Sequence, residues 1–326
     1  MVQLEQETRS VDNGHGWQLR LTRTWAPERL HPGTRPILLL TGYGMNDFVL
    51  GYHPQGRPMI RVLAEAGLEI WSGSMRRQRG SRRLERRAGL PGLQAFAAQD
   101  VPVLIDAALR HSRTEASRVD LVGSSLGGSV AYAHLALCPD TPVGALVALG
   151  APLQWDRVHP ALRVLFASER VAGLVPMTGT DRVARRLFPV VAKVPGLLSI
   201  YMNLDHVSVH EARELTRGVD EPDRRVNRDL VRWMRNGTMV FDGVDVSAAL
   251  AHERRPLLVI LANRDGIVPP ASATPALGLW GGSDTTLLEI GTPSDWYAHA
   301  DLFIAPEAPE RVFAPMAAWL LDRQRG

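Results

Sequence analysis

The feature that most constrains this chain is a short segment between an apolar run and a helical pattern. Residues 123–127 read Gly-Ser-Ser-Leu-Gly. The run 119–122 before them is typical of a buried strand, and residues 126–137 after them follow helical periodicity. The flanking glycines permit a sharp strand-to-helix turn, in which a serine is held in strained backbone geometry. The segment therefore predicts a serine presented at the end of a strand.

Buried apolar runs recur along the chain and alternate with helical patterns. Further runs stand at residues 37–40, 68–71, 145–149, 257–261 and 286–290. Helical patterns cover residues 59–66, which end at Gly67, residues 100–110 with Asp100 as N-cap and Pro102 in the first turn, and residues 309–323. Residues 17–25 alternate in polarity and predict a half-buried antiparallel strand. Together these patterns predict an α/β fold, with a mostly parallel central sheet covered by helices on both faces.

One long segment breaks this alternation. Residues 153–252 are rich in helix-compatible residues, proline and glycine, and they contain no clear buried strand. Because structureless loops of that length are uncommon, we expect a helical insertion before the penultimate core strand. The expected organisation is a core formed by residues 1–152 and 253–326, interrupted by this insertion.

Composition excludes several classes of protein. The 326 residues are 45% hydrophobic, which supports a sizeable core, and the net charge of +3 is too small to indicate a nucleic-acid partner. The only cysteine, Cys138, permits no intramolecular disulfide and no cysteine-based zinc site. The start shows no signal-peptide pattern, and no apolar stretch is long enough to span a membrane. We expect a cytoplasmic protein without cofactor, bound metal or integral membrane association.

The segment 123–127 matches the G-x-S-x-G pattern of a nucleophile elbow. Only Ser125 has glycine two positions away on both sides, so Ser125 is the candidate nucleophile, and Ser124 is a supporting hydroxyl or a spacer. A serine needs a base to take its proton. His299 is the only histidine that follows Asp265, the candidate acid considered next, and it comes after the run 286–290. The alternatives are an ordinary strand-helix turn and a lone surface histidine.

The candidate acid is Asp265, which follows the run 257–261 at the edge where open α/β sheets bind ligands. The other position used for such an acid follows the run 145–149, where the sequence Gly-Ala-Pro offers no carboxylate. Asp295 and Asp301 flank the histidine and are rivals, but each more plausibly serves its own loop. The alternative for Asp265 is an ordinary turn aspartate beside Gly266.

Acyl transfer also requires hydrogen-bond donors for the developing oxyanion. The backbone N–H of Leu126, directly after the nucleophile, is one candidate. The N–H of Tyr43, in the glycine-rich loop 41–44, is the other. The glycines of this loop could equally serve only to turn the chain.

Taken together, these motifs resemble the α/β-hydrolase superfamily, and within it the branch that contains acid lipases and polyhydroxyalkanoate synthase-like proteins. The resemblance is carried by residues 41–44 with Asn46, by 123–128, by Asp265 with 268–269, and by 299–302. It covers residues 35–152 and 253–326, and the insertion matches only loosely. It implies the triad Ser125, Asp265 and His299 under a helical cap. Thr41 and Ser124 stand where many relatives have histidine, and Ser125 stands where the polymer synthases have cysteine, which favours hydrolysis.

Two further features concern the substrate. Seven arginines fall between Arg76 and Arg87 and form either a solvated loop or a surface that attracts an anionic acyl donor or lipid. Apolar stretches at 187–191 and 197–202 either pack the insertion against the core or line an acyl pocket.

The sequence thus predicts a serine hydrolase acting on small, apolar carboxylic esters, of esterase or lipase type. An acyltransferase or thioesterase with the same triad is one alternative, and a non-catalytic binding protein on a hydrolase scaffold is another. The sequence is also compatible with a homo-oligomer.

Overall fold

The computed structural model describes residues 2–156, 158, 198–221 and 223–324. Nine strands form one sheet in the order β1-β2-β4-β3-β6-β7-β10-β11, with β5 paired to β2. The strands are β1 (Glu5–Asp12), β2 (Trp17–Trp25), β3 (Ile37–Leu40), β4 (Ile70–Ser74), β5 (Arg82–Arg83), β6 (Val119–Ser124), β7 (Val143–Leu149), β10 (Leu257–Ala262) and β11 (Thr285–Ile290). From β4 to β11 all neighbouring strands are parallel, whereas β1, β2 and β5 are joined to the sheet by antiparallel pairing.

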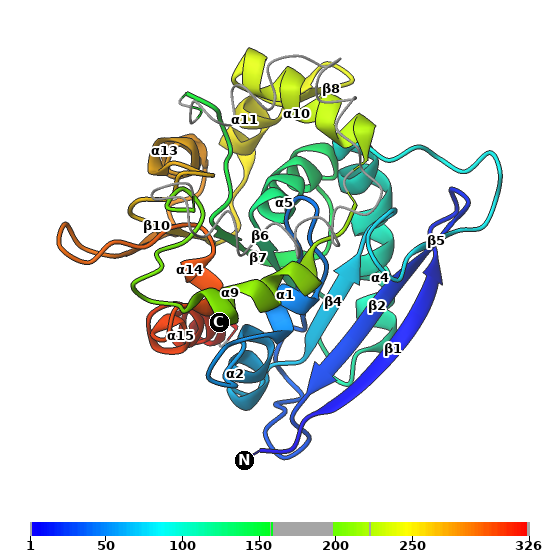
Figure 1. The fold of residues 1–326 in the computed structure, drawn as a ribbon. Coiled ribbons are helices and arrows are strands. Elements are labelled where there is room, and N and C mark those ends of the chain that lie inside the picture. Colours follow the sequence, from blue (N-terminus) through cyan, green and yellow to red (C-terminus); the bar gives the residue numbers. More distant parts are fainter. Residues whose placement is uncertain (1, 157, 159–197, 222, 325–326) are drawn as a thin grey trace.

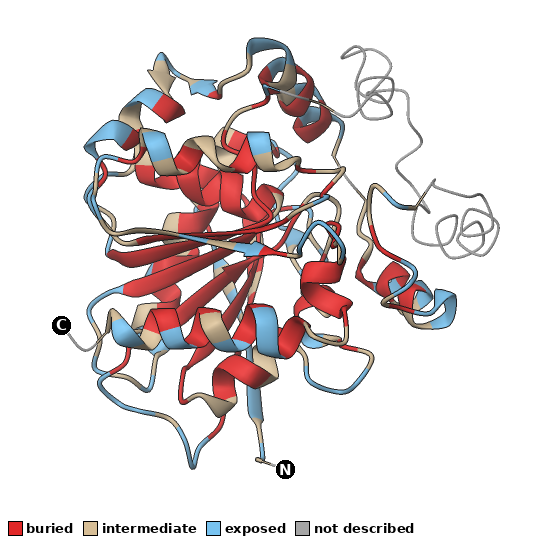
Figure 2. Cartoon of the chain, turned by 90° about the vertical axis from the view of Figure 1, so that its left-hand side faces the viewer, coloured by how far each residue is buried: buried red, intermediate tan, exposed pale blue. Residues whose placement is uncertain are grey.

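Helices cover both faces of this sheet (Figures 1 and 2). Before the insertion they are α1 (Phe48–Gly51), α2 (Met59–Glu65), α3 (Leu93–Ala95), η1 (Phe96–Asp100), α4 (Val101–His111) and α5 (Leu126–Leu137). After it they are α12 (Pro270–Ala273), α13 (Pro275–Leu279), α14 (Asp301–Ile304), η4 (Pro309–Phe313) and α15 (Ala314–Asp322). This architecture confirms the predicted fold class.

Strand β3 shows why the central strands are continuous apolar runs. Its four residues are all buried, and they alternate between the two faces of the sheet. Leu38 and Leu40 join the core cluster formed with α4 and α5. Ile37 and Leu39 join the cluster formed with α2 and α15. The sheet therefore separates two apolar layers, and its carboxyl edge is left for polar chemistry.

In the described part of the segment between β7 and β10, most of the regular structure is helical. It contains α9 (Val209–Glu214), η2 (Leu215–Gly218), α10 (Arg224–Asn236), α11 (Val246–Ala249) and η3 (Leu250–His252). A small hairpin, β8 (Val240–Phe241) with β9 (Val244–Asp245), was not expected from the sequence. Within the described residues, no helix has the length and apolar character needed to cross a bilayer.

Two elements differ from the sequence-based expectation. The strand predicted at 68–71 lies at Ile70–Ser74, and the carbonyl of Glu69 just before it accepts the N–H of Ile37 at the entry to β3. The helix predicted to begin at Asp100 starts at Leu93 and continues through η1 into α4. Asp100 makes no cap hydrogen bond, because its carboxylate binds the buried side chain of Arg76 instead.

Candidate active site

Ser125 occupies the turn between β6 and α5. Its backbone has φ 51° and ψ −124°, a conformation that residues with side chains rarely adopt. The N–H of Ser125 donates to the carbonyl of Leu149 at 2.8 Å, which ties this strained turn to the neighbouring strand β7. The rest of the fold thus holds the serine in place at the carboxyl edge of the sheet.

The glycines around the turn allow two close approaches. A Cβ at Gly127 would lie 2.3 Å from the carbonyl oxygen of Leu40, so only glycine lets α5 start so near β3. A Cβ at Gly42 would lie 2.9 Å from the Cβ of Ser125. The glycine-rich loop after β3 therefore packs directly against the candidate nucleophile.

His299 and Asp265 form a buried pair. The Nδ1 atom of His299 lies 2.6 Å from the Oδ2 atom of Asp265, and both residues are buried. The second carboxylate oxygen, Oδ1, accepts the backbone N–H groups of Ile267 and Val268 at 2.8 and 2.7 Å. This aspartate is thereby fixed at the end of β10 with its remaining oxygen directed at the imidazole. The pair can hold one histidine tautomer and stabilise an imidazolium.

The rival carboxylates of the histidine loop bind other groups. Asp295 lies 3.1 Å from Arg311 and 3.4 Å from His206. Asp301 begins α14 and accepts backbone N–H groups, as described below. Neither is the partner of the His299 Nδ1 atom.

Residues 200–203, which we call the strap, connect the loops that carry the acid and the histidine. The N–H of Gly266, next to Asp265, donates to the carbonyl of Ile200 at 3.0 Å. The N–H of Ala300, next to the histidine, donates to the carbonyl of Tyr201 at 2.7 Å. The strap therefore holds the loops of Asp265 and His299 from outside the sheet. Sequence reasoning gave no sign of it, because its contacts are made by backbone groups.

The last strap residue binds a buried carboxyl group. The Oδ2 atom of Asp301 accepts the N–H of Asn203 at 2.9 Å and that of Ala298 at 2.7 Å. The side chain of Asn203 donates to the carbonyl of Trp296 at 2.9 Å. Burial raises the pKa of Asp301 to about 7, against the lowering effect of the two backbone hydrogen bonds. Asp301 and Asn203 thus position the histidine loop without contacting the cavity.

The ring of Tyr201 lies beside the histidine. The centroids of the Tyr201 and His299 rings are 6.2 Å apart. Burial, together with the charges of Asp265 and Asp301, raises the pKa of this phenol to about 12. Tyr201 is therefore a neutral wall of the site at physiological pH.

The loop that carries Tyr43 is held by side chains on both sides. The Thr41 hydroxyl donates to the carbonyl of Met45 at 3.0 Å and accepts from the Gln78 amide at 3.0 Å. The Tyr43 hydroxyl donates to the Oδ1 atom of Asn227 on α10 at 2.5 Å. Burial raises the pKa of Tyr43 more than this hydrogen bond lowers it.

A cavity of about 320 Å³ joins these groups. Ser125, Leu126, Tyr43 and His299 all line it, and Ser124 lines it beside them while its hydroxyl donates to the carbonyl of Leu40. The other described lining residues are predominantly apolar, and among the described lining residues there is no carboxylate, lysine or arginine.

Residues of the insertion contribute to this cavity. Leu230, Trp233 and Met234 come from α10, and Tyr201 comes from the strap. The apolar stretch at 187–191 and residue 197, considered above as pocket or packing residues, lie outside the described residues. In the described part of the chain, no cluster of three or more histidine, cysteine, aspartate or glutamate side chains is arranged to hold a metal ion.

Solved structures similar to this chain cover nearly its whole length. A hydrolase from Pseudomonas aeruginosa has a TM-score of 0.64 at 18% identity, covering 98% of this chain and 99% of that chain. A soluble variant of monoglyceride lipase from Saccharomyces cerevisiae has a TM-score of 0.64 at 15% identity, covering 97% and 94%. A thermophilic esterase from Thermogutta terrifontis has a TM-score of 0.61 at 17% identity, covering 98% and 99%.

These similarities confirm the α/β-hydrolase fold that was expected from the sequence. No family model and no curated protein matches the chain. The narrower resemblance to acid lipases and polyhydroxyalkanoate synthase-like proteins stays a prediction.

Proposed function

We propose that this protein hydrolyses small, apolar carboxylic esters through an acyl-enzyme on Ser125. One observation carries the proposal: His299, which is buried and lies 2.6 Å from Asp265, lines the same apolar cavity as a serine in strained backbone geometry. The hydrolases, esterases and lipases of similar fold support it at the level of the fold.

In the first step, Asp265 accepts a hydrogen bond from the Nδ1–H group of His299, so that the Nε2 atom of the histidine is the base. His299 takes the hydroxyl proton as the Ser125 oxygen attacks the ester carbonyl. The backbone N–H groups of Leu126 and Tyr43 stabilise the negative charge of the tetrahedral intermediate. His299 then gives the proton to the leaving alcohol, and the acyl group remains on Ser125.

In the second step, water replaces Ser125 as the nucleophile. His299 removes a proton from the water as its oxygen attacks the acyl carbonyl, and it returns that proton to the Ser125 oxygen when the acid is released. Each turnover therefore consumes one ester and one water and gives one acid and one alcohol.

The cavity supports apolar, uncharged substrates. Its described walls offer no charged partner for an anionic or cationic substrate group, and burying an unpaired charge is costly. Since α10 supplies part of the wall, we interpret residues 153–252 as a cap on a core formed by residues 1–152 and 253–326.

The proposal is tested by fluorophosphonate labelling read by intact-mass spectrometry, followed by turnover of p-nitrophenyl esters of increasing acyl length. We expect one adduct on the wild type and none on Ser125→Ala, with turnover lowered about 10⁴-fold or more. Ser124→Ala is the matched control, since its hydroxyl bonds a backbone carbonyl, and it should keep the adduct.

Several outcomes would separate the alternatives. A labelled Ser125 with faster turnover of thioesters, or with acyl transfer to added alcohols, would indicate the thioesterase or acyltransferase. A folded wild type that is neither labelled nor active would contradict the proposal and favour a non-catalytic binding protein.

A further inference from the structure

The arginine-rich segment forms a loop that projects from the sheet (Figure 1). It leaves β4 after Ser74, pairs briefly with β2 through β5, and returns toward α3. Because β4 is parallel to β3, and β3 to β6, this loop starts at the same edge of the sheet as the Ser125 turn.

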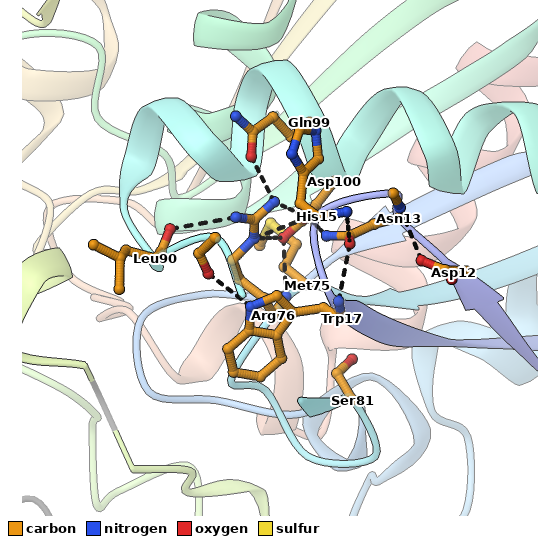
Figure 3. A network of polar contacts seen from close by, with 12 residues as sticks. Asp12, Asn13, His15, Trp17, Met75, Arg76, Ser81, Leu90, Gln99 and Asp100 are labelled. Atoms are coloured by element: carbon orange, nitrogen blue, oxygen red, sulfur yellow. Dashed lines mark hydrogen bonds and ion pairs between the residues drawn. The ribbon is translucent and has the colours of Figure 1, made fainter. Parts of the chain in front are cut away.

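The base of the loop is fixed by the first arginine of the segment (Figure 3). Arg76 is fully buried, its Nη2 atom lies 2.7 Å from the Oδ1 atom of Asp100, and its Nη1 atom donates to the carbonyl of Leu90 at 3.3 Å. The Trp17 indole donates to the carbonyl of Gly89 at 2.7 Å. Arg76 therefore belongs to the interior of the fold, and only the arginines beyond it are available at the surface.

The tip of the loop is both basic and apolar. Residues 82–87, which read Arg-Arg-Leu-Glu-Arg-Arg, are all exposed. Leu84 and Leu90 are 46% and 53% exposed, and both belong to the small group of exposed large apolar residues in the described part of the chain. Isolated exposed leucines are ordinary, but two leucines set among unpaired arginines make an amphipathic surface.

The amino end of α10 extends this basic surface. Arg224 and Arg225 are exposed there, and Arg225 lines the same surface hollow, of about 440 Å³, as Arg77, Arg83 and Leu90. We call the combined surface the basic rim, consisting of Arg77, Arg83, Arg86, Arg87, Arg224 and Arg225.

The charge of the basic rim is mostly uncompensated. Asp223 lies 3.7 Å from Arg77 and also caps α10. Within the described residues, no carboxylate lies within ion-pair distance of the other five arginines. The rim thus gathers six arginines around one nearby aspartate, whereas the whole chain has a net charge of only +3.

The basic rim also lies beside the candidate active site. Arg77 borders a small cavity together with Gly42, Tyr43 and Leu126, the residues around the proposed oxyanion donors. A planar surface that contacts the rim would therefore also lie at the edge of the molecule that contains the apolar cavity.

We propose that the basic rim docks this protein peripherally on an anionic lipid bilayer, with Leu84 and Leu90 entering the headgroup boundary. Arginines near an anionic bilayer each add to the attraction, and exposed apolar side chains add a component that salt does not screen. A nucleic acid would use the arginines but would leave the two leucines without a role. The proposal does not depend on the hydrolase activity.

The test is cosedimentation of the Ser125→Ala chain with vesicles of phosphatidylcholine alone or with about 30% phosphatidylglycerol, at about 0.1 M NaCl. We expect binding to the anionic vesicles only. Replacing Arg83, Arg86 and Arg87 together by glutamine should lower the partition coefficient at least about tenfold. Because binding is measured on an inactive variant, failure of the proposed hydrolysis and failure of docking are separate results.

The matched control removes three exposed arginines, Arg29, Arg110 and Arg118, which lie toward the opposite edge of the sheet, and it should bind like the parent. The Leu84→Ser/Leu90→Ser variant should also bind more weakly, even though its charge is unchanged.

Three results would overturn the proposal. The first is equal binding of the protein to neutral and anionic vesicles, and the second is an equal loss of vesicle binding in the control triple variant. The third is unchanged vesicle binding of the leucine variant, combined with tight binding to duplex DNA that depends on the rim arginines. The last would identify the rim as a nucleic-acid surface.

Discussion

Two carboxyl groups hold the histidine loop, and their surroundings give them different properties. Asp265 accepts two backbone N–H groups on one oxygen and the imidazole on the other. Asp301 receives both of its backbone donors on Oδ2, and its Oδ1 atom has no hydrogen-bond partner among the described residues. Burial therefore raises the pKa of Asp301 to about 7, so this carboxyl can be protonated near neutral pH.

This difference predicts how the stability of an Asp301→Asn variant depends on pH. An amide oxygen can accept both N–H groups, with the NH₂ group in place of the unpartnered oxygen. The unfolded chain loses the Asp301 proton near pH 4 and the folded chain near pH 7, so wild-type stability falls as pH rises through that window, by at most about 4 kcal/mol. Urea denaturation should give similar stabilities near pH 4, with the variant increasingly more stable as the pH rises toward 8.5, because it buries no charge.

Asp301→Ala is the control for this prediction. It removes the acceptor of two buried N–H groups and should lose about 1–3 kcal/mol. A stability difference between wild type and Asp301→Asn that does not change with pH would contradict the assigned titration.

At the residue scale, the sequence could nominate Ser125, Asp265 and His299, because motif, chain order and strand ends are local information. It could not nominate Asn203, because its role depends on a backbone N–H that meets Asp301 from a distant part of the chain. The preference for Asp265 over Asp301 and Asp295 rested on strand position alone.

Among the elements, the helix Leu93–His111 shows where local rules fail. An aspartate two residues before a proline is a good start signal, and α4 does begin at Val101, directly after Asp100. The signal did not reveal that α3 and η1 continue the helix back to Leu93, nor that Asp100 binds the guanidinium of Arg76 instead of capping α4. The edge strand β1 was missed for a different reason: its residues are mostly polar, and none of them is buried.

The Arg76–Asp100 pair should be important for stability. Asp100→Ala leaves a buried guanidinium without its counter-charge and should lower the free energy of unfolding by about 3–5 kcal/mol. Asp106→Ala, in the following helix α4, removes an exposed ion pair with Arg110 and should cost less than about 1 kcal/mol. Urea denaturation would decide, and equal effects of the two substitutions would contradict the role assigned to Asp100.

Over the whole molecule, strand and helix alternation was enough to predict the layered architecture. The central strands of the sheet are buried on both faces, which makes them continuous apolar runs that a sequence reveals directly. The arrangement of the insertion was not predictable, because the strap is held by backbone hydrogen bonds to loops that are distant in sequence. The cavity walls contributed by α10 were missed for a similar reason.

The strap also predicts that activity and the sheet are lost separately in urea. The loops that carry Asp265 and His299 are hydrogen-bonded to a segment outside the sheet, whereas the central strands are buried between two apolar layers. Local opening of the strap should therefore precede global unfolding. We expect fluorophosphonate labelling of Ser125 to vanish at lower urea than the far-ultraviolet circular dichroism of the sheet, and coincident transitions would contradict this order.

The position of the strap in the chain also has a consequence during synthesis. Ser125 is synthesised first, then the strap, then Asp265 and finally His299. A serine without its base is a poor nucleophile, so under the proposed mechanism a nascent chain would not yet hydrolyse esters. Reactivity would be acquired only when the His299 loop packs against the strap, and the chain would be inert for most of its own synthesis.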